Sequence, residues 1–328
     1  MLKNRLKLLL IILAILLISL PISSLTSSER LYRKTSGEHI KWVDFTVTAE
    51  AMNDALAIAL DAYKNGYDAD FVGLLSYLGA KYGGNFKLYK KSDLTALYER
   101  IKEGASLDSL GAKYNYYPYF SEAYGAVLDG YVGEFYLNGK SCFGLRAFSP
   151  IAEGYYYKHY DDFGASRSYG YNRKHLGHDL VGSVGTPIIA VESGYVEELG
   201  WNQYGGWRIG IRSFDNKRYY YYAHLRKDHP YVKDLENGDT VIAGEVIGYM
   251  GMTGYSSKEN VNNIDTPHLH FGIQLIFDPS QKDGINQIWI DCYELTKFLS
   301  QNRMPVVVTE DGRDRKAQNN VAIYDIPD

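Results

Sequence analysis

The chain has 328 residues and a formal net charge of −4, with 45% hydrophobic and 23% charged residues. This acidic balance disfavours a nucleic-acid partner. Cys142 and Cys292 are the two cysteines, too few for a disulfide framework, and whether they pair stays open.

The first 25 residues are predicted to direct export. Three basic residues precede an apolar run at positions 8–20, and a serine-rich stretch follows it. A run of this length fits the core of a signal peptide, whereas a count that continues to Leu25 approaches the roughly 20 residues of a membrane span. Residues 1–25 are therefore predicted to be a signal peptide or a membrane anchor. Because the basic residues come first, the rest of the chain is expected outside the cytoplasm, either secreted or anchored to the membrane by residues 8–25.

Residues 26–147 are predicted to form a helical domain of unknown role. Its first helix covers residues 48–64, with Thr48 as the N-cap and Gly66 beyond its end. Further helices are predicted at residues 70–82, 92–103 and 106–112. A tyrosine-rich segment follows at residues 114–119.

Residues 148–303 change to short strands separated by glycine-rich turns, which indicates a mostly antiparallel sheet domain. The predicted strands cover residues 188–191, 195–199, 207–212, 219–224, 246–250 and 268–276. The turn at residues 213–217 joins two of them as a hairpin. The predicted fold class is therefore α+β, with a helical domain followed by a mostly antiparallel β-sheet domain.

Three segments of this domain carry candidate metal ligands. The first places His175 four residues before Asp179, and Gly177 between them indicates a tight turn. The last carries His268 and His270, which would point to the same face of a strand.

The middle segment is rich in strand-forming residues and ends at His224. Strand alternation would put Tyr220 and Tyr222 on the same face as His224, so these two tyrosines are predicted to line a substrate groove beside the metal. Six of the eight histidines lie between His175 and His270, which random scatter explains poorly.

The chain is predicted to close with a helix at residues 291–302. Asp291 would be its N-cap, and Glu294 stands at the reciprocal capping-box position. Residues 304–328 are predicted to be a polar C-terminal tail.

Catalytic zinc is commonly held by three nitrogen or oxygen ligands, with a fourth position open for water. Imidazoles and a carboxylate in this combination make a metal-dependent hydrolase the leading hypothesis. Two of the five candidate groups are then left for proton transfer, a task that suits the ordinary pKa range of histidine.

The motifs resemble those of the lysostaphin-like (LytM-type) zinc endopeptidases, which cut peptidoglycan. The likeness rests on the HxGxD turn at residues 175–179, Tyr-x-His-Leu at residues 222–225 and Pro-His-Leu-His-Phe at residues 267–271, and it covers roughly residues 155–277. It implies a peptidase domain of the duplicated-hybrid-motif type within residues 148–303.

Carried over residue by residue, the resemblance implies one Zn²⁺ per chain. Its ligands would be His175, Asp179 and His270. His224 and His268 would be the catalytic residues beside the metal, and which of them is the general base stays open. His178 is treated as a structural residue, because the family pattern has a variable residue at its position. No further cofactor is expected.

The expected function is that of an exported zinc metalloendopeptidase that hydrolyses a peptide bond in peptidoglycan stem peptides or cross-bridges. One alternative is a non-catalytic or autoinhibited adaptor on the same fold that binds the cell wall or a protein. Another is a zinc amidase or carboxypeptidase that acts on the same polymer. The expected partner is peptidoglycan, together with the membrane if the N-terminal segment is not cleaved; neither the bond that is cut nor the oligomeric state is predicted.

Overall fold

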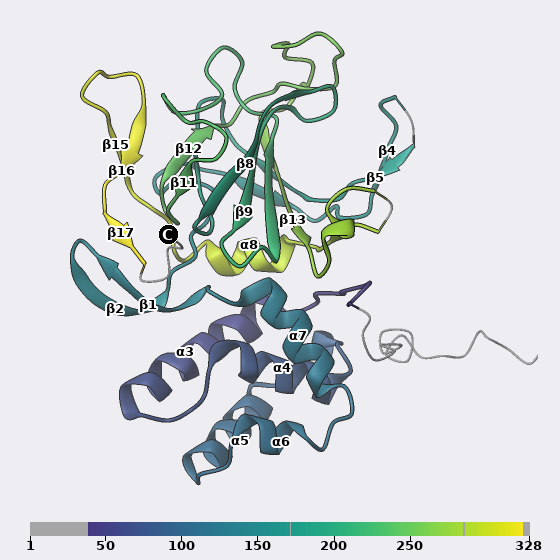
Figure 1. The fold of residues 1–328 in the computed structure, drawn as a ribbon, viewed down its shortest axis with the longest axis vertical. Helices are drawn as coiled ribbons and strands as arrows, with labels where there is room; N and C mark the ends of the chain where they lie inside the picture. The colour runs from purple at the N-terminus through teal and green to yellow at the C-terminus, as the bar shows by residue number, and fades with distance from the viewer. Residues whose placement is uncertain (1–38, 171, 285, 324–328) are drawn as a thin grey trace, which may run out of the picture. The chain divides into compact units, whose positions relative to one another are not determined.

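The structure, a computed structural model, describes residues 39–170, 172–284 and 286–323 (Figure 1). Among these residues, no helix is long and apolar enough to cross a membrane. The signal peptide or anchor predicted at residues 1–25 lies outside the described residues.

Helices occupy the first part of the described chain, and their ends follow local capping rules. Thr48, Asp70 and Ser106 each accept a hydrogen bond from a backbone N–H of the helix that follows them. Gly66 ends the first helix with a φ of 74°, a conformation that glycine adopts readily. The helices are α3 (Ala49–Asn65), α4 (Phe71–Tyr82), η1 (Phe86–Leu88), α5 (Lys91–Lys102), α6 (Leu107–Gly111) and α7 (Tyr117–Leu128).

Helix α7 was not predicted, because its tyrosines masked a helical pattern. Its first turn carries Pro118, a position where the missing N–H costs no hydrogen bond. Tyr124 is 1% exposed and its ring packs against the rings of Phe45 and Phe120. The tyrosine-rich segment therefore contributes to the helical core.

Strands follow the helices and pair antiparallel in the described residues. The largest sheet has the order β11-β8-β9-β10-β13-β6-β3, and β14 also pairs with β13. Its strands are β3 (Lys158–Tyr160), β6 (His178–Val181), β8 (Gly194–Asn202), β9 (Gly206–Ser213), β10 (Arg218–Ala223), β11 (Thr240–Val241), β13 (His268–Leu275) and β14 (Ile288–Trp289). The predicted α+β fold class is confirmed, whereas the predicted domain boundary between residues 147 and 148 stays a prediction.

Shorter sheets surround the large one. Strand β7 (Pro187–Ile189) pairs with β12 (Val246–Tyr249), and β4 (Ser166–Arg167) pairs with β5 (Arg173–Lys174). The region predicted as a polar tail contains strands: β15 (Val306–Val308) pairs with β16 (Arg315–Ala317).

The third strand of this C-terminal region is β17 (Val321–Ala322), which pairs with β1 (Val132–Leu137), itself paired with β2 (Lys140–Leu145). Buried Phe135, Phe148, Met304 and Val321 form a common hydrophobic cluster there.

The closing helix α8 (Tyr293–Leu299) is shorter than predicted, and its predicted capping box is wrong. Cys292 precedes the helix without a side-chain cap, although the Asp291 carboxylate accepts a hydrogen bond from the backbone N–H of Tyr293. The Glu294 carboxylate instead accepts a 2.7 Å hydrogen bond from the N–H of Ala49, at the start of α3. A carboxylate is favourable there because the helix N-terminus carries partial positive charge.

Both cysteines are free thiols. Cys292 is fully buried, and burial raises the pKa of its thiol well above the usual range. Cys142 is partly exposed on β2. The structure therefore has no disulfide between them.

A buried ion pair holds the hairpin between β9 and β10 to the rest of the chain. The Arg218 side chain is 2% exposed and donates two hydrogen bonds to the Glu192 carboxylate, of 2.7 and 2.9 Å. It also donates to the Asp215 carboxylate and to the Ala126 carbonyl of α7. Together these partners compensate for the removal of the Arg218 charge from water.

We expect Glu192→Ala to lower the free energy of unfolding by about 3 kcal/mol, because it leaves a buried guanidinium with too few partners. Glu197→Ala is the matched control. It removes a carboxylate that also pairs with an arginine, Arg212, but at a site where Glu197 is 33% exposed, so its cost is expected to stay below about 1 kcal/mol. Urea denaturation measures both, and equal costs would contradict the importance of burial.

Candidate metal centre

Strand pairing brings the predicted ligands together in the middle of the large sheet. On β13, His270 lies opposite Asp179 of β6 on one side and opposite Ala223 of β10 on the other. His175 comes from the loop immediately before β6, and His224 is the first residue after β10. Residues distant in the sequence therefore share one site because three neighbouring strands carry them.

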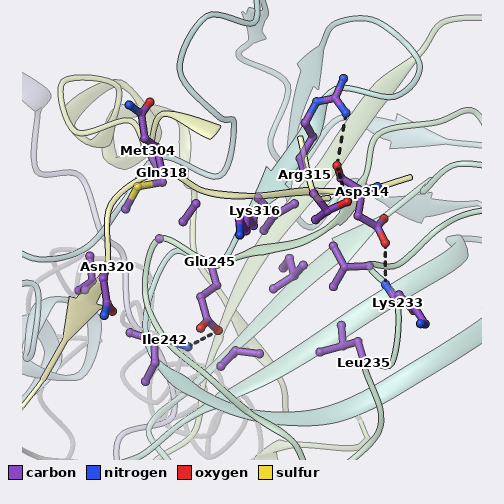
Figure 2. Close-up of a pocket in the computed structure, with 18 of the residues that line it drawn as sticks. Lys233, Leu235, Ile242, Glu245, Met304, Asp314, Arg315, Lys316, Gln318 and Asn320 are labelled. Atoms are coloured by element: carbon purple, nitrogen blue, oxygen red, sulfur yellow. Dashed lines mark hydrogen bonds between the residues drawn. The ribbon is translucent and has the colours of Figure 1, made fainter. Parts of the chain in front are cut away.

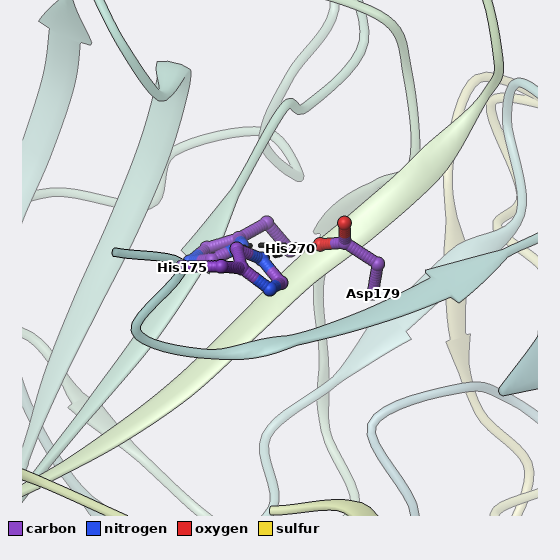
Figure 3. A group of neighbouring side chains, drawn as sticks. All are labelled: His175, Asp179 and His270. Atoms are coloured by element: carbon purple, nitrogen blue, oxygen red, sulfur yellow. Dashed lines mark hydrogen bonds and ion pairs between the residues drawn. The ribbon is translucent and has the colours of Figure 1, made fainter. Parts of the chain in front are cut away.

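The atoms of the three predicted ligands converge. His175 Nε2 lies 2.8 Å from His270 Nδ1 and 3.1 Å from Asp179 Oδ1, and His270 Nδ1 lies 3.1 Å from the same carboxylate oxygen. Figure 3 shows the Asp179 carboxylate facing the two imidazoles. His175, Asp179 and His270 are the group that the described residues offer as a metal site.

The chemistry of these atoms fits a cation. His175 Nδ1 faces two acceptors, a carboxylate oxygen and the carbonyl oxygen of Asp162, so it carries the proton and Nε2 presents a lone pair. Asp179 Oδ1 is a second acceptor. His270 Nδ1 faces both His175 Nε2 and Asp179 Oδ1, and the one proton that it can carry satisfies only one of them. Two imidazole nitrogens and a carboxylate oxygen are donors that suit zinc, so His175, Asp179 and His270 would hold the ion through these three atoms.

Burial and charge act together on these groups. Burial raises the pKa of Asp179, but the close contacts of its carboxylate with His175 and His270 outweigh burial and hold that pKa far below its usual range. Burial lowers the pKa of His270, partly offset by the neighbouring carboxylate. An ionised carboxylate and a neutral imidazole are the forms that bind metal.

The two predicted catalytic histidines lie beside the cluster. The His224 ring is 4.8 Å from the His268 ring and 5.8 Å from the His270 ring, centroid to centroid. His224 Nδ1 lies 2.9 Å from the Thr253 carbonyl oxygen, and His268 Nδ1 lies 2.8 Å from the Thr266 carbonyl oxygen. Since a carbonyl only accepts, each Nδ1 is protonated and each neutral ring keeps its lone pair on Nε2.

His224 is buried and its backbone has a φ of 62°, which is uncommon for a residue with a side chain. Burial is the main reason why its pKa lies well below the usual value, and His268 and His270 lower it further. The ring is therefore neutral near pH 7. Its unusual backbone is held by hydrogen bonds on both sides, from its N–H to the Gly205 carbonyl and from the Gly251 N–H to its carbonyl.

The prediction that Tyr220 and Tyr222 line the substrate groove is wrong. Both side chains are completely buried: the Tyr220 hydroxyl donates to the Glu192 carboxylate, and the Tyr222 hydroxyl accepts from the Val191 N–H. The left-handed conformation of His224 breaks the strand alternation on which the prediction depended.

The tyrosines of the opposite strand face line the groove instead. Tyr219 and Tyr221 belong to a groove of about 350 Å³ that also contains His175, His224 and His270. Tyr221 packs its ring against the His270 ring at 5.9 Å. Strand alternation therefore predicted the wrong face of β10. The cause is the backbone conformation of His224, which the sequence pattern does not show.

His178, the structural histidine, faces away from the cluster. It precedes Asp179 on β6, so its side chain points to the other face of the sheet. Its Nε2 lies 2.9 Å from His159 Nδ1, and burial is the main cause that lowers its pKa to about 3. The structure gives it no place among the ligands.

Gly177 is required by close packing. A Cβ atom at this position would lie 2.5 Å from His270 Cε1, 2.6 Å from His270 Nε2 and 2.9 Å from the Phe271 carbonyl oxygen. Both the ligand ring and the β13 backbone therefore leave room only for hydrogen.

We expect Gly177→Ala to displace His270 and to weaken zinc binding at least about 10-fold, with a loss of roughly 1–3 kcal/mol in stability from overpacking. Gly144→Ala is the control, because the nearest atom to its added Cβ would be the Leu60 side chain at 3.8 Å. Competition with a chromogenic chelator measures the zinc affinity. Unchanged affinity in Gly177→Ala would contradict this role of the glycine.

A larger groove lies elsewhere and offers no chemistry of this kind (Figure 2). Asp314 is buried in it, but its carboxylate already accepts hydrogen bonds from Tyr249 and from the Lys233 N–H, and it pairs with His229. Glu245 accepts from the Ile242 N–H. We assign this groove no function.

Comparison with known proteins places the site in a described family. Residues 173–284 match the model of Peptidase family M23. The L-Ala--D-Glu endopeptidase of Bacillus subtilis is 39% identical over 124 residues, which are 38% of this chain and 36% of that protein. Lysostaphin of Staphylococcus simulans is 41% identical over 98 residues, which are 30% of this chain and 17% of that protein.

A solved LytM structure from Ruminococcus gnavus covers 87% of this chain and 99% of that chain, with a TM-score of 0.56 and 22% identity, so this likeness shows the fold. The matched part of the chain spans 36% of the length of the Bacillus subtilis relative and 17% of the length of lysostaphin. The family match includes the three converging ligands as well as His224 and His268. Residues 173–284 form a domain of Peptidase family M23.

Proposed function

We propose that this protein is a zinc-dependent endopeptidase that hydrolyses a peptide bond in peptidoglycan outside the cytoplasm. The observation that carries the proposal is the convergence of His175, Asp179 and His270 within hydrogen-bond distance of one another, with His224 and His268 beside them. The names of the relatives in family M23 support peptidoglycan as the substrate. The basic and apolar N-terminal segment supports export.

When bound by the three ligands, zinc activates water at neutral pH and polarises the scissile carbonyl. The residues of the chain move the protons. His224 and His268 each hold Nδ1 on a backbone carbonyl, so in its neutral form either ring can accept a proton at Nε2 and return it to the leaving amine. The backbone hydrogen bonds fix the orientation of both rings.

The groove supplies a place for an extended peptide. Tyr219 and Tyr221 line it together with Tyr204, Tyr255 and Trp289. Such rings combine a large apolar contact with hydroxyl or N–H groups at their edges. A peptide in this groove would pass beside His175 and His270, two of the predicted ligands.

The test is to incubate the zinc-loaded full-length chain with purified peptidoglycan and to identify the released fragments by mass spectrometry. We expect new amino termini, which name the bond that is cut. Release of whole stem peptides that begin at their first residue, with a free lactyl carboxylate left on the sugar, would indicate an amidase, and release of single C-terminal residues would indicate a carboxypeptidase. Absence of any release despite bound zinc would contradict the proposed function and favour a binding adaptor.

A further inference from the structure

A charged pair just ahead of the matched family region touches two of the three predicted ligands. Arg167 Nη2 donates to Asp162 Oδ2, and it lies 3.3 Å from Asp179 Oδ2. Asp162 Oδ1 in turn lies 3.1 Å from His175 Nδ1. Neither residue belongs to the motifs that the sequence analysis identified, and both precede residue 173, where the family match begins.

We propose that Asp162 and Arg167 are positioning residues that hold His175 and Asp179 in the orientation that binds the metal. The inference rests on the proposed use of a metal. It adds that metal affinity in this chain depends on two side chains outside the ligand set.

Asp162 acts on His175 through the nitrogen that does not face the cluster. A carboxylate beside Nδ1 keeps the proton there, directs the lone pair of Nε2 toward Asp179 and His270, and makes Nε2 more basic. The Oδ1 atom of Asp162 is buried and makes no hydrogen bond among the described residues; its polar contact there is with His175 Nδ1, at 3.1 Å. This carboxylate oxygen therefore serves His175 alone.

Arg167 acts on the carboxylate ligand. Its contact with Asp179 Oδ2 leaves Oδ1 as the oxygen that faces the two imidazoles. The side chains are mostly shielded from water, with exposed fractions of 26% for Arg167, 24% for Asp162 and 16% for Asp179. Solvent therefore screens the attraction between their charges only in part. The guanidinium also balances the negative charge that Asp162 brings close to the cluster.

The backbone holds this segment in place independently of the two side chains. The Gly164 N–H donates to the His175 carbonyl at 2.7 Å, and the His175 N–H donates to the Ala165 carbonyl at 2.8 Å. Pairing of β4 with β5 adds a further constraint. Substitution of Asp162 or Arg167 is therefore expected to leave the loop docked and to change the orientation of the ligands.

The test compares zinc dissociation constants of full-length chains by chelator competition, with the melting temperature of each metal-free form as a second readout. We expect Asp162→Ala and Arg167→Gln to weaken zinc binding about 10–100-fold, with little change in metal-free melting temperature. Asp162→Asn should lose less, since its amide oxygen can still accept from His175. The double variant should lose less than the product of the single losses, because Arg167 acts partly through Asp162.

Asp161→Asn and Lys158→Gln are matched controls, as each removes one charge from an exposed neighbouring side chain, and both should bind zinc like the wild type. Wild-type affinity in Asp162→Ala and Arg167→Gln would overturn the positioning role while leaving the proposed function intact. Weaker binding that accompanies an equal loss of metal-free stability would also overturn it, since the pair would then be a structural clamp. A wild-type chain that binds no zinc would instead refute the proposed function.

Discussion

His224→Ala and His268→Ala are each expected to retain zinc and to lose peptidoglycan hydrolysis by at least about 100-fold. General acid–base groups contribute roughly 10²–10⁴-fold to enzymatic rates. Neither ring contributes to the group of converging ligand atoms. Each ring instead presents Nε2 beside that group and anchors Nδ1 on a backbone carbonyl.

Two measurements on the same preparations check this expectation: bound zinc by elemental analysis, and the rate of release of new amino termini from peptidoglycan. His39→Ala is the matched control, because it removes a histidine whose contact within the described residues is an ion pair 3.9 Å from Asp278. Loss of zinc together with activity would reassign the altered histidine as a ligand. Full activity in either variant would remove that histidine from the mechanism.

The pH dependence of the two variants would separate their roles. A group that must accept a proton gives a rate that falls as pH drops through its pKa, and a group that must donate gives a rate that falls as pH rises through its pKa. Comparison of the residual rates of His224→Ala and His268→Ala across pH therefore shows whether each ring controls the fall in rate at low pH or the fall at high pH. The positions of His224 and His268 in the sequence do not show which ring accepts the proton and which donates it.

Spacing and alternation were sufficient to identify five candidate groups, whereas the assignment of His175, Asp179 and His270 as the ligands rests on the family resemblance. A histidine and an aspartate four residues apart, and two histidines on one strand, are readable from spacing and alternation alone. What the spacing could not show is the pairing of His270 with Asp179 across β13 and β6, which depends on strand register. Register is a long-range property that no single segment contains.

The errors have equally local causes. Period-two alternation put Tyr220 and Tyr222 in the groove, but it fails at His224, whose positive φ is unexpected for a residue other than glycine. Glu294 was assigned to its own helix, whereas it caps α3, 245 residues earlier in the chain. Asp162 and Arg167 were missed because their function depends on contacts with His175 and Asp179, and no motif announces such contacts.

Removal of one ligand is expected to abolish the stabilisation that zinc confers. A ligand at 1,000 times its dissociation constant stabilises the native state by about 4 kcal/mol. His270→Ala leaves His175 and Asp179 as the remaining ligands, so its melting temperature is expected to be the same with zinc and with a chelator. The wild-type chain should melt several degrees higher with zinc than with a chelator.

His178→Ala is the informative comparison, because His178 is another histidine beside Asp179 and is buried. Its ring contacts His159 on the other face of β6, so this variant should start from a lower metal-free stability and yet gain the full zinc-dependent shift. The quantity to compare is therefore the shift between zinc and chelator, and the absolute melting temperature is secondary. A full shift in His270→Ala, or its loss in His178→Ala with the fold intact, would mean that the metal is held on the opposite face of the strand.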